Sequence, residues 1–351
     1  MLYFPILRSK KGELSALESL AAPIKEVIRP VLQVPPPDLA RDGSPVAPSS
    51  KHVQKMASNL QLALQPAAGL SCFLDPSPAG FSLTLLEELL TAVAYYGGSP
   101  QPLYQLSGSQ PYARLYQRLI GRPHTALLRV TLNDANARLS ATVSAALTQY
   151  GLQADQTLLL LDMGDISEAN LPLRLYESTF SMAIGLTAGL NLAGYVVTSC
   201  ALPATLPETM VKWVPKQFVR HEVTVFRHIK ADSGEDIHFG DYALGNVITG
   251  PAPSRTGSPK LRYTLATEYE VVKGQKTDNP PNTMSEQYHR LSRHAVSHPG
   301  YSGPAFSWGD DYIHKASQPG PASTSRGSLA TWVTVHTSHH LELVVSMLPA
   351  M

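Results

Sequence analysis

The chain has 351 residues, of which 43% are hydrophobic and 16% charged, and its formal net charge is +1. A net charge so near zero gives no whole-molecule attraction for nucleic acid, although it allows a local basic patch. The start of the chain lacks the features of a signal peptide, and its apolar runs are shorter than the roughly 20 residues of a membrane helix. These properties predict a soluble, cytoplasmic protein with one large domain or two smaller ones.

Eight short apolar runs alternate with segments of helical periodicity. Several runs, most clearly Leu158–Leu161, are apolar on both faces, as are parallel strands covered by helices. This alternation is typical of a (β/α)₈ barrel; an open doubly wound sheet shares it, but no Gly-x-Gly-x-x-Gly follows the first strand. The predicted strands are Leu2–Leu7, Ile28–Val34, Ser71–Leu74, Pro102–Leu106, Ala126–Val130, Thr157–Asp162, Tyr195–Cys200 and Ile237–Ala243.

The pattern changes after the eighth run. Tyr263–Val272 and Thr331–Val345 alternate like antiparallel strands, and a helix is predicted near Ser285–His298. Residues 1–245 are therefore predicted to form the barrel. Residues 246–351 are predicted to form an α+β elaboration that packs on the barrel and completes or caps it.

Polar side chains gather where the predicted strands end, which is where barrels of this class carry their functional groups. Clustered carboxylates can hold Mg²⁺ or Mn²⁺, or act as general acid and base, and arginines can hold phosphate. The combination suits phosphoester hydrolysis or phosphate recognition; alternatively, the charges pair with one another and solvate the rim. The candidates are Arg8, Lys10, Asp75, Gln105, Arg129, Asp162, Asp165 and Asp241.

The enzymatic interpretation assigns a role to each charged candidate. Asp162, Asp165 and Asp241 bind the divalent ion, and Asp162 and Asp241 also count as catalytic. Arg8, Lys10 and Arg129 stabilise developing negative charge, and Asp75 is a reserve acid or base. Asp162 follows four leucines, so its charge needs a partner, and Arg129 on the neighbouring strand is the expected one. A structural ion pair is an equally good interpretation of these two residues.

The C-terminal region is rich in histidine and aromatic residues. His339 and His340 are adjacent; in a strand they would point to opposite faces, so they could not bind one ion together, and His339 is the candidate to face the barrel mouth. The segment Tyr301–His314 interleaves aromatic residues with glycines and two acids. It predicts a lid or partner-binding loop with Trp308 as anchor and Asp310 beside it, or a plug at the barrel end.

Several short motifs, taken in order over nearly the whole chain, resemble the beta family of proteins. The resemblance implies a cytosolic protein of bacteria and prophages, often associated with mobile elements, with a role in conflict with phage. It implies no active site, because it transfers no catalytic residue. The motifs are Tyr3-Phe-Pro-Ile-Leu-Arg-Ser-Lys-Lys-Gly-Glu13, Leu161-Asp-Met-Gly-Asp165, Phe239-Gly-Asp-Tyr242, Arg262-Tyr-Thr264, Phe306-Ser-Trp-Gly-Asp310, and Trp332 followed by His339-His340.

Two functions are compatible with these patterns. The first is a metal-dependent phosphoester hydrolase, phosphodiesterase- or nuclease-like, that acts on nucleic acid or a nucleotide in an anti-phage or mobile-element system. The alternative is a non-catalytic sensor or adaptor whose rim and Phe306–Asp311 loop bind a phage or host protein. A DNA-binding protein is a weaker hypothesis, because the sequence shows no basic stripe interleaved with aromatics and no helix-turn-helix pattern.

Overall fold

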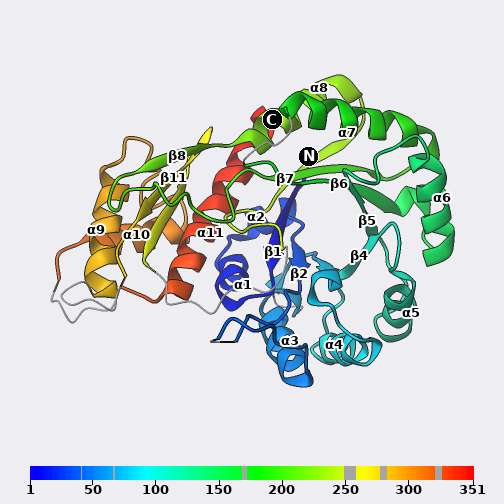
Figure 1. Cartoon of the computed structure of the whole chain (residues 1–351), viewed down its shortest axis with the longest axis horizontal. Helices are drawn as coiled ribbons and strands as arrows, with labels where there is room; N and C mark the ends of the chain where they lie inside the picture. Colours follow the sequence, from blue (N-terminus) through cyan, green and yellow to red (C-terminus); the bar gives the residue numbers. More distant parts are fainter. Residues whose placement is uncertain (41, 66–67, 168–171, 249–257, 277–282, 321–325) are drawn as a thin grey trace.

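In the computed structural model, eight parallel strands close into a barrel and follow one another round its wall in chain order (Figure 1). The structure describes residues 1–351 apart from 41, 66–67, 168–171, 249–257, 277–282 and 321–325. Each barrel strand coincides with a predicted one, so the predicted (β/α)₈ barrel is confirmed. The strands are β1 (Tyr3–Arg8), β2 (Val31–Gln33), β3 (Phe73–Asp75), β4 (Gln101–Gln105), β5 (Ala126–Thr131), β6 (Thr157–Asp165), β7 (Gly194–Cys200) and β9 (Ile237–Asp241).

Alternation along each strand sorts the side chains between the inside of the barrel and its helix-covered outside. Phe4, Phe73 and Leu160 belong to the core that fills the barrel, whereas Leu74 and Leu161 pack in the core beneath the helices. Both faces are apolar, which explains the nearly continuous hydrophobic runs in the sequence. The same alternation decides which polar side chains at the strand ends point inward.

Helices cover the outside of the barrel, as in other folds of this class. Ser82 caps the N-terminus of one of them by accepting a hydrogen bond from the amide of Leu85, and Gly151 ends another in the left-handed conformation that favours glycine. The helices are α1 (Lys11–Glu18), α2 (Ala22–Val27), α3 (Ser50–Leu64), α4 (Leu83–Tyr95), α5 (Gln110–Leu119), α6 (Leu139–Tyr150), α7 (Leu173–Thr187) and α8 (His221–Ser233).

An antiparallel sheet with strand order β10-β11-β8 lies beside the barrel, together with two helices. β10 (Lys260–Thr264) and β11 (Glu268–Lys273) form a hairpin that overlaps the region Tyr263–Val272 expected to contain strands. α9 (Met284–Ser297) coincides with the predicted helix, and α10 (Trp308–Ser317) follows it. The unpredicted β8 (Lys216–Val219) comes from the segment between β7 and α8. Residues on both sides of position 245 therefore build this sheet.

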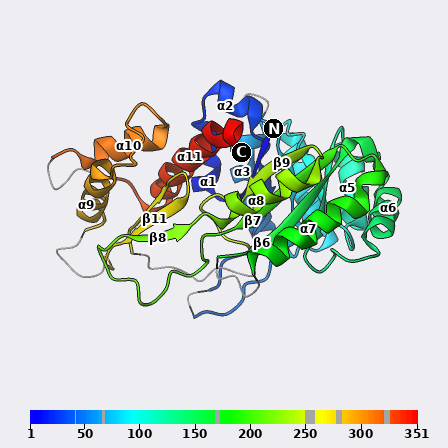
Figure 2. The ribbon, with the colours of Figure 1, turned by 90° about the horizontal axis from the view of Figure 1, so that it is seen from above.

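The prediction of a strand over Thr331–Val345 was wrong, because these residues lie in the long helix α11 (Leu329–Met347). Two views show this helix standing between the barrel and the small sheet (Figures 1 and 2). It contacts α1, α10 and β10, and its residues are buried on nearly every side. A helix buried in this way shows no single apolar stripe, so its β-branched residues look strand-like.

Within the part of the chain that the structure describes, no helix is both long and apolar enough to span a membrane.

Candidate functional site

Five polar side chains gather inside the carboxyl end of the barrel. Gln33, Asp75, Arg129, Asp162 and Tyr242 form this barrel-mouth cluster; the first four continue the inward-facing series of their strands. Arg129 lies between two carboxylates, with Nη1 2.8 Å from Asp75 Oδ2 and Nε 3.2 Å from Asp162 Oδ2. The expected pairing of Arg129 with Asp162 is therefore present, and a second, unexpected pair with Asp75 accompanies it.

The two carboxylates of the cluster differ in their surroundings. Asp75 is fully buried; its Oδ2 accepts hydrogen bonds from Gln33 (2.9 Å) and Arg129, and its Oδ1 accepts from the Ser77 amide (3.1 Å) and hydroxyl. Asp162 is 7% exposed and accepts from the Gly164 amide (2.9 Å) and the Tyr242 hydroxyl (2.7 Å). Asp75 therefore orients Arg129, whereas Asp162 keeps a small exposed fraction.

The charges of the cluster hold Arg129 and Tyr242 in defined protonation states. Burial alone would lower the pKa of Arg129, but Asp75 and Asp162 outweigh burial and raise it. Burial and the charge of Asp162 raise the pKa of Tyr242 well above its ordinary value, so its hydroxyl stays protonated and donates to the carboxylate.

Four buried polar atoms in and beside the cluster have no hydrogen-bond partner among the described residues. They are Nε and Nη2 of Arg129, Oε1 of Gln33 and Oγ1 of Thr198. Nε of Arg129 is still within ion-pair distance of Asp162, and Thr198 is the register neighbour of Asp162 on β7. Buried polar atoms are usually paired, so unpaired ones beside a cluster of charges indicate where a ligand can bind.

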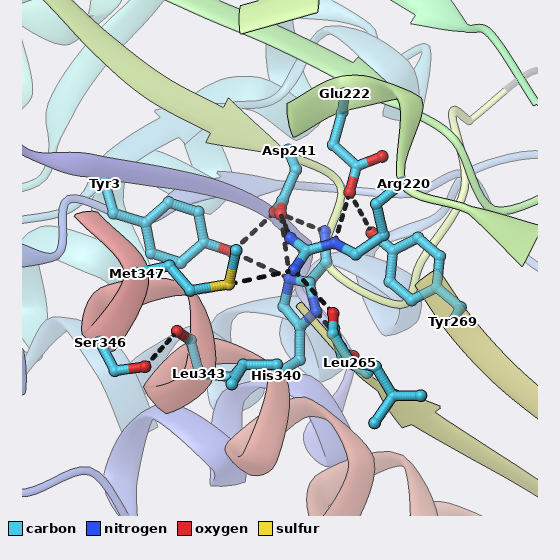
Figure 3. Close-up of polar contacts among 12 residues, drawn as sticks. Tyr3, Arg220, Glu222, Asp241, Leu265, Tyr269, His340, Leu343, Ser346 and Met347 are labelled. Carbon is cyan, nitrogen blue, oxygen red and sulfur yellow. Dashed lines mark hydrogen bonds and ion pairs between the residues drawn. The ribbon is translucent and has the colours of Figure 1, made fainter. Parts of the chain in front are cut away.

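Asp241 lies on the other face of the barrel wall. It follows Ile237 and Phe239, which face the helices, and it points toward α11 (Figure 3). Its Oδ1 accepts from the Tyr3 hydroxyl at 2.7 Å, and its Oδ2 lies 3.0 Å from His340 Nε2 and 3.9 Å from Arg220 Nη2. Asp241 and the barrel-mouth cluster are thus separated by the wall.

The side chains around Asp241 form a closed outer-wall cluster. Beside it, Glu222 Oε1 accepts hydrogen bonds from Arg220 Nε and the Tyr269 hydroxyl, both at 2.8 Å. Burial opposes the charge of Asp241, but His340, Arg220 and the Tyr3 hydrogen bond outweigh it and lower the pKa of Asp241. This cluster joins β1, β9 and α8 to β11 and α11, which is a structural role. Its members are Tyr3, Arg220, Glu222, Asp241, Tyr269 and His340.

The structure does not bring together the three aspartates predicted to bind a metal ion. Asp162 lies inside the barrel and Asp241 outside it. Asp165 is exposed at the end of β6, where it accepts hydrogen bonds from the amide and hydroxyl of Ser167. In the described residues, no group of three or more His, Cys, Asp or Glu side chains could hold a metal ion.

The remaining rim candidates lie around the barrel-mouth cluster rather than in it. Arg8 pairs with Glu13 (Nη2 to Oε1, 2.6 Å) and Lys10 with Asp38 (Nζ to Oδ1, 2.8 Å) at the start of α1. Gln105 donates to the Ser77 hydroxyl at 3.1 Å, and that hydroxyl contacts Asp75. Gln105 therefore reaches the cluster indirectly.

Trp308, Asp310 and His339 lie in the C-terminal region, and His339 does not face the barrel mouth as predicted. Asp310 Oδ2 is 2.8 Å from His339 Nδ1, and its Oδ1 accepts from Tyr263 at 2.8 Å. Adjacent residues of the helix α11 also point in different directions, and His339 and His340 each contact a different aspartate. Trp308 begins α10, in the segment expected to be a loop or a plug, and is 39% exposed.

Sequence reasoning missed several polar residues of both clusters. Gln33 lies two positions after the inward-facing Val31 and is buried. The one signal in the sequence that could have identified it is a single polar residue within an otherwise apolar strand. Tyr242 is adjacent to Asp241, so alternation places the two on opposite faces, but the sequence does not show which of them faces inward. Arg220 and Glu222 lie in a stretch without a predicted strand.

Comparison with known proteins gives remote structural likenesses and one family. No curated protein matches the chain. Arginine decarboxylase of Paramecium bursaria Chlorella virus, bound to agmatine, is 10% identical with a TM-score of 0.38; the match covers 69% of this chain and 58% of the enzyme. This chain thus spans less than two thirds of that enzyme's length. The GH53 catalytic domain of Ignisphaera aggregans is also 10% identical, with a TM-score of 0.36 and coverages of 70% and 89%. Likenesses this remote carry no information about activity.

Family membership rests on the sequence. The model of the Beta protein family matches residues 3–346, in agreement with the order of the short motifs along the chain. The match spans both the barrel and the C-terminal region. The chain therefore belongs to the Beta protein family.

Proposed function

We propose that the chain hydrolyses phosphoesters at the barrel mouth, with Arg129 as the phosphate-binding group and Asp162 as the general base. The observation that carries this proposal is the buried Arg129, which two carboxylates hold in place while its Nη2 has no hydrogen-bond partner among the described residues. A guanidinium fixed in this way can present its remaining N–H groups to phosphate oxygens. The strand ends are also where barrels of this class carry their chemistry.

The proposed reaction uses the different positions of the two carboxylates. The phosphate binds to Nη2 of Arg129, and Asp162 accepts a proton from a water molecule whose oxygen forms the new bond to phosphorus. The ester P–O bond breaks, the departing oxygen takes a proton from solvent, and Asp162 later releases its proton to solvent. Asp75 keeps Arg129 in position and does not contact the reacting atoms.

Dependence on Mg²⁺ or Mn²⁺ remains a prediction. Of the three aspartates first considered, only Asp162 belongs to the barrel-mouth cluster. Substrate phosphate oxygens and water would have to supply most of the ligands, as is common for Mg²⁺ in phosphoryl-transfer sites.

Release of nitrophenol from mono- and bis-(nitrophenyl) phosphate, with Mg²⁺, with Mn²⁺ or with a chelator, tests the proposal. We expect Asp162→Asn to lower the rate at least about 100-fold, the usual effect of losing a general base, and Arg129→Gln to raise KM. Asp232→Asn, on the exposed surface of α8, is the matched control and should leave the rate unchanged. A folded Asp162→Asn protein with full activity would exclude this assignment.

The exposed Trp308 favours a second candidate function, that of a non-catalytic sensor or adaptor. This side chain lines a surface hollow of about 530 Å³ together with residues of α1 and α11, and exposed tryptophans are frequent anchors of protein interfaces. The partner would be a phage or host protein, and conflict with phage is the setting that family resemblance implies. Affinity capture from phage-infected cells should recover a complex that Trp308→Ala abolishes and that Val211→Ala, also at an exposed apolar residue, preserves. Recovery of no partner would count against this function.

A further inference from the structure

Three surface hollows adjoin one another where α1, α3 and α11 meet. The first, of about 600 Å³, is lined by the loop before α1, residues 35–38 and the start of α3. The second, of about 410 Å³, lies over β10, β11 and α11, and the third is the hollow beside Trp308. Ala330 lines all three, and Arg8 lines the first two. We call this continuous surface the α11 groove.

Cations dominate the lining of the α11 groove. The lining contains eight cations against three carboxylates, Glu13, Glu18 and Asp38, in a chain whose net charge is only +1. Two of the carboxylates are paired within the groove, with Arg8 and Lys10. The cations come from three distant parts of the sequence: Arg8, Lys10, Lys11, Lys51, Lys55, Lys260, Arg262 and Lys273.

Some of these cations are available to a ligand. Lys11, Lys51 and Lys55 are exposed, and no ion pair with another described residue engages them. Lys51 and Lys55 are four residues apart at the start of α3, so they lie on the same face of the helix. An unpaired row of ammonium groups beside a hollow attracts phosphate and other anions.

We infer that the α11 groove binds single-stranded nucleic acid. Cations distributed over adjoining hollows match a chain of phosphates better than a single phosphate, and they supply the electrostatic contribution to binding. Trp308 lies at one end of the groove with 39% of its surface exposed, which gives an unpaired base an aromatic ring on which to stack. Bases in a duplex are already stacked on one another, so this ring favours a single strand.

This inference goes beyond the proposed hydrolysis and does not depend on it. The groove needs only its cations and Trp308, whereas hydrolysis needs the barrel-mouth cluster. If both hold, the phosphodiester of a bound strand is the substrate class.

Fluorescence anisotropy with a labelled oligothymidine of about 20 nucleotides, longer than the site of one binding module, tests the inference. We expect Lys51→Glu/Lys55→Glu to weaken binding at least roughly 10-fold and to make the slope of log K against log salt shallower by about 1.4, or 0.7 per lost phosphate contact. Trp308→Ala should weaken binding roughly 5- to 100-fold with an unchanged slope, because stacking is not ionic. The matched control, Arg114→Glu/Arg227→Glu, makes the same change of net charge on exposed positions of α5 and α8 and should bind like the wild type.

Absence of binding at low salt, an equal loss in both double variants, or equal affinity for a duplex would overturn the inference. Asp162→Asn protein is measured in parallel, since it keeps the groove intact. If the wild type and Asp162→Asn both bind the oligonucleotide but neither hydrolyses phosphoesters, the proposed function is contradicted and the groove assignment stands. If the wild type hydrolyses small phosphoesters but binds no oligonucleotide, the groove assignment is contradicted and the proposed function stands.

Discussion

Glu342 is a half-buried carboxyl group on α11, where its charge is disfavoured. Burial, together with the nearby charge of Asp310, raises the pKa of Glu342 from 4.5 to about 7, although His339 lowers it in part. Asp310 and His339 pair with each other, so His339 does not fully offset the effect of Asp310 on Glu342. The folded protein therefore binds a proton here that the unfolded chain has already released.

This difference predicts how stability depends on pH. Between pH 4.5 and about 7 the folded state holds more protons than the unfolded state, so the Glu342 contribution to stability falls as pH rises through this window. Glu342→Gln removes the ionisable group and should raise the melting temperature at pH 8 while leaving it nearly unchanged at pH 4. Calorimetry of this variant beside Glu26→Gln, at a surface position of α2, measures the effect. A stabilisation of the same size at both pH values would contradict the assignment.

The sequence shows the order of the strands but not which face of each strand points into the barrel, so it predicts some site residues and not others. Asp162 and Arg129 lie at the ends of adjacent strands, so their pairing follows from strand order and the cost of a lone buried charge. Strands that are apolar on both faces carry no mark of which face points inward. Asp162 and Asp241 therefore look equivalent in the sequence although the barrel wall separates them.

At the scale of elements, α11 shows where periodicity failed. Ten of its residues are buried, including five consecutive polar ones, from His336 to His340. Burial on every side removes the amphipathic pattern that identifies a surface helix. The sequence pattern that marks the start of α11 is also unusual. The capping box of Ser328 uses Thr331, where glutamate or glutamine is usual.

The contact between α10 and α11 depends on a missing side chain. A Cβ atom built on Gly309 would clash with the carbonyl oxygen of Val335, a backbone atom that cannot rotate away. Gly309→Ala should therefore force the helices apart and lower the free energy of unfolding by about 1–3 kcal/mol, the usual cost of overpacking. Urea denaturation followed by circular dichroism measures the change.

Gly185 provides the matched control for this helix contact. It lies within α7, and a Cβ atom there meets nothing within 4 Å. Gly185→Ala should leave stability unchanged or raise it by up to about 1 kcal/mol, since alanine favours helix more than glycine does. Equal effects of the two substitutions would show that the close approach at Gly309 is unimportant.

At the scale of the whole molecule, the barrel and the C-terminal region are interleaved. β8 belongs to the small sheet although it lies between β7 and α8 in sequence. The outer-wall cluster adds buried contacts between the two parts, with Tyr3 and Asp241 on the barrel and His340 on α11. The alternation of apolar runs with helical segments predicted the barrel, but four residues of β8 with alternating exposure are too short a pattern to predict the shared sheet.

This interleaving predicts that the chain unfolds in one transition. Trp213, Trp308 and Trp332, all the tryptophans of the chain, lie in or against the C-terminal region, so their fluorescence reports on that region. Far-ultraviolet circular dichroism reports on the whole molecule. The two melting curves should coincide, as cooperative unfolding requires.

His340→Ala tests the coupling through the outer-wall cluster. The substitution removes the buried contact between His340 Nε2 and Asp241 Oδ2, and loss of a partner by a buried polar group costs about 1–3 kcal/mol. Both melting curves should shift down together, and Asp241→Asn/His340→Ala should recover part of the loss because a neutral amide costs less to bury than a carboxylate. Asp241 has a lowered pKa, so its ionic contribution is fully present above its ordinary pKa and is lost as pH falls through the lowered value. The shift caused by His340→Ala should therefore shrink on acidification; a fluorescence curve that moves alone would mean that the C-terminal region unfolds independently of the barrel.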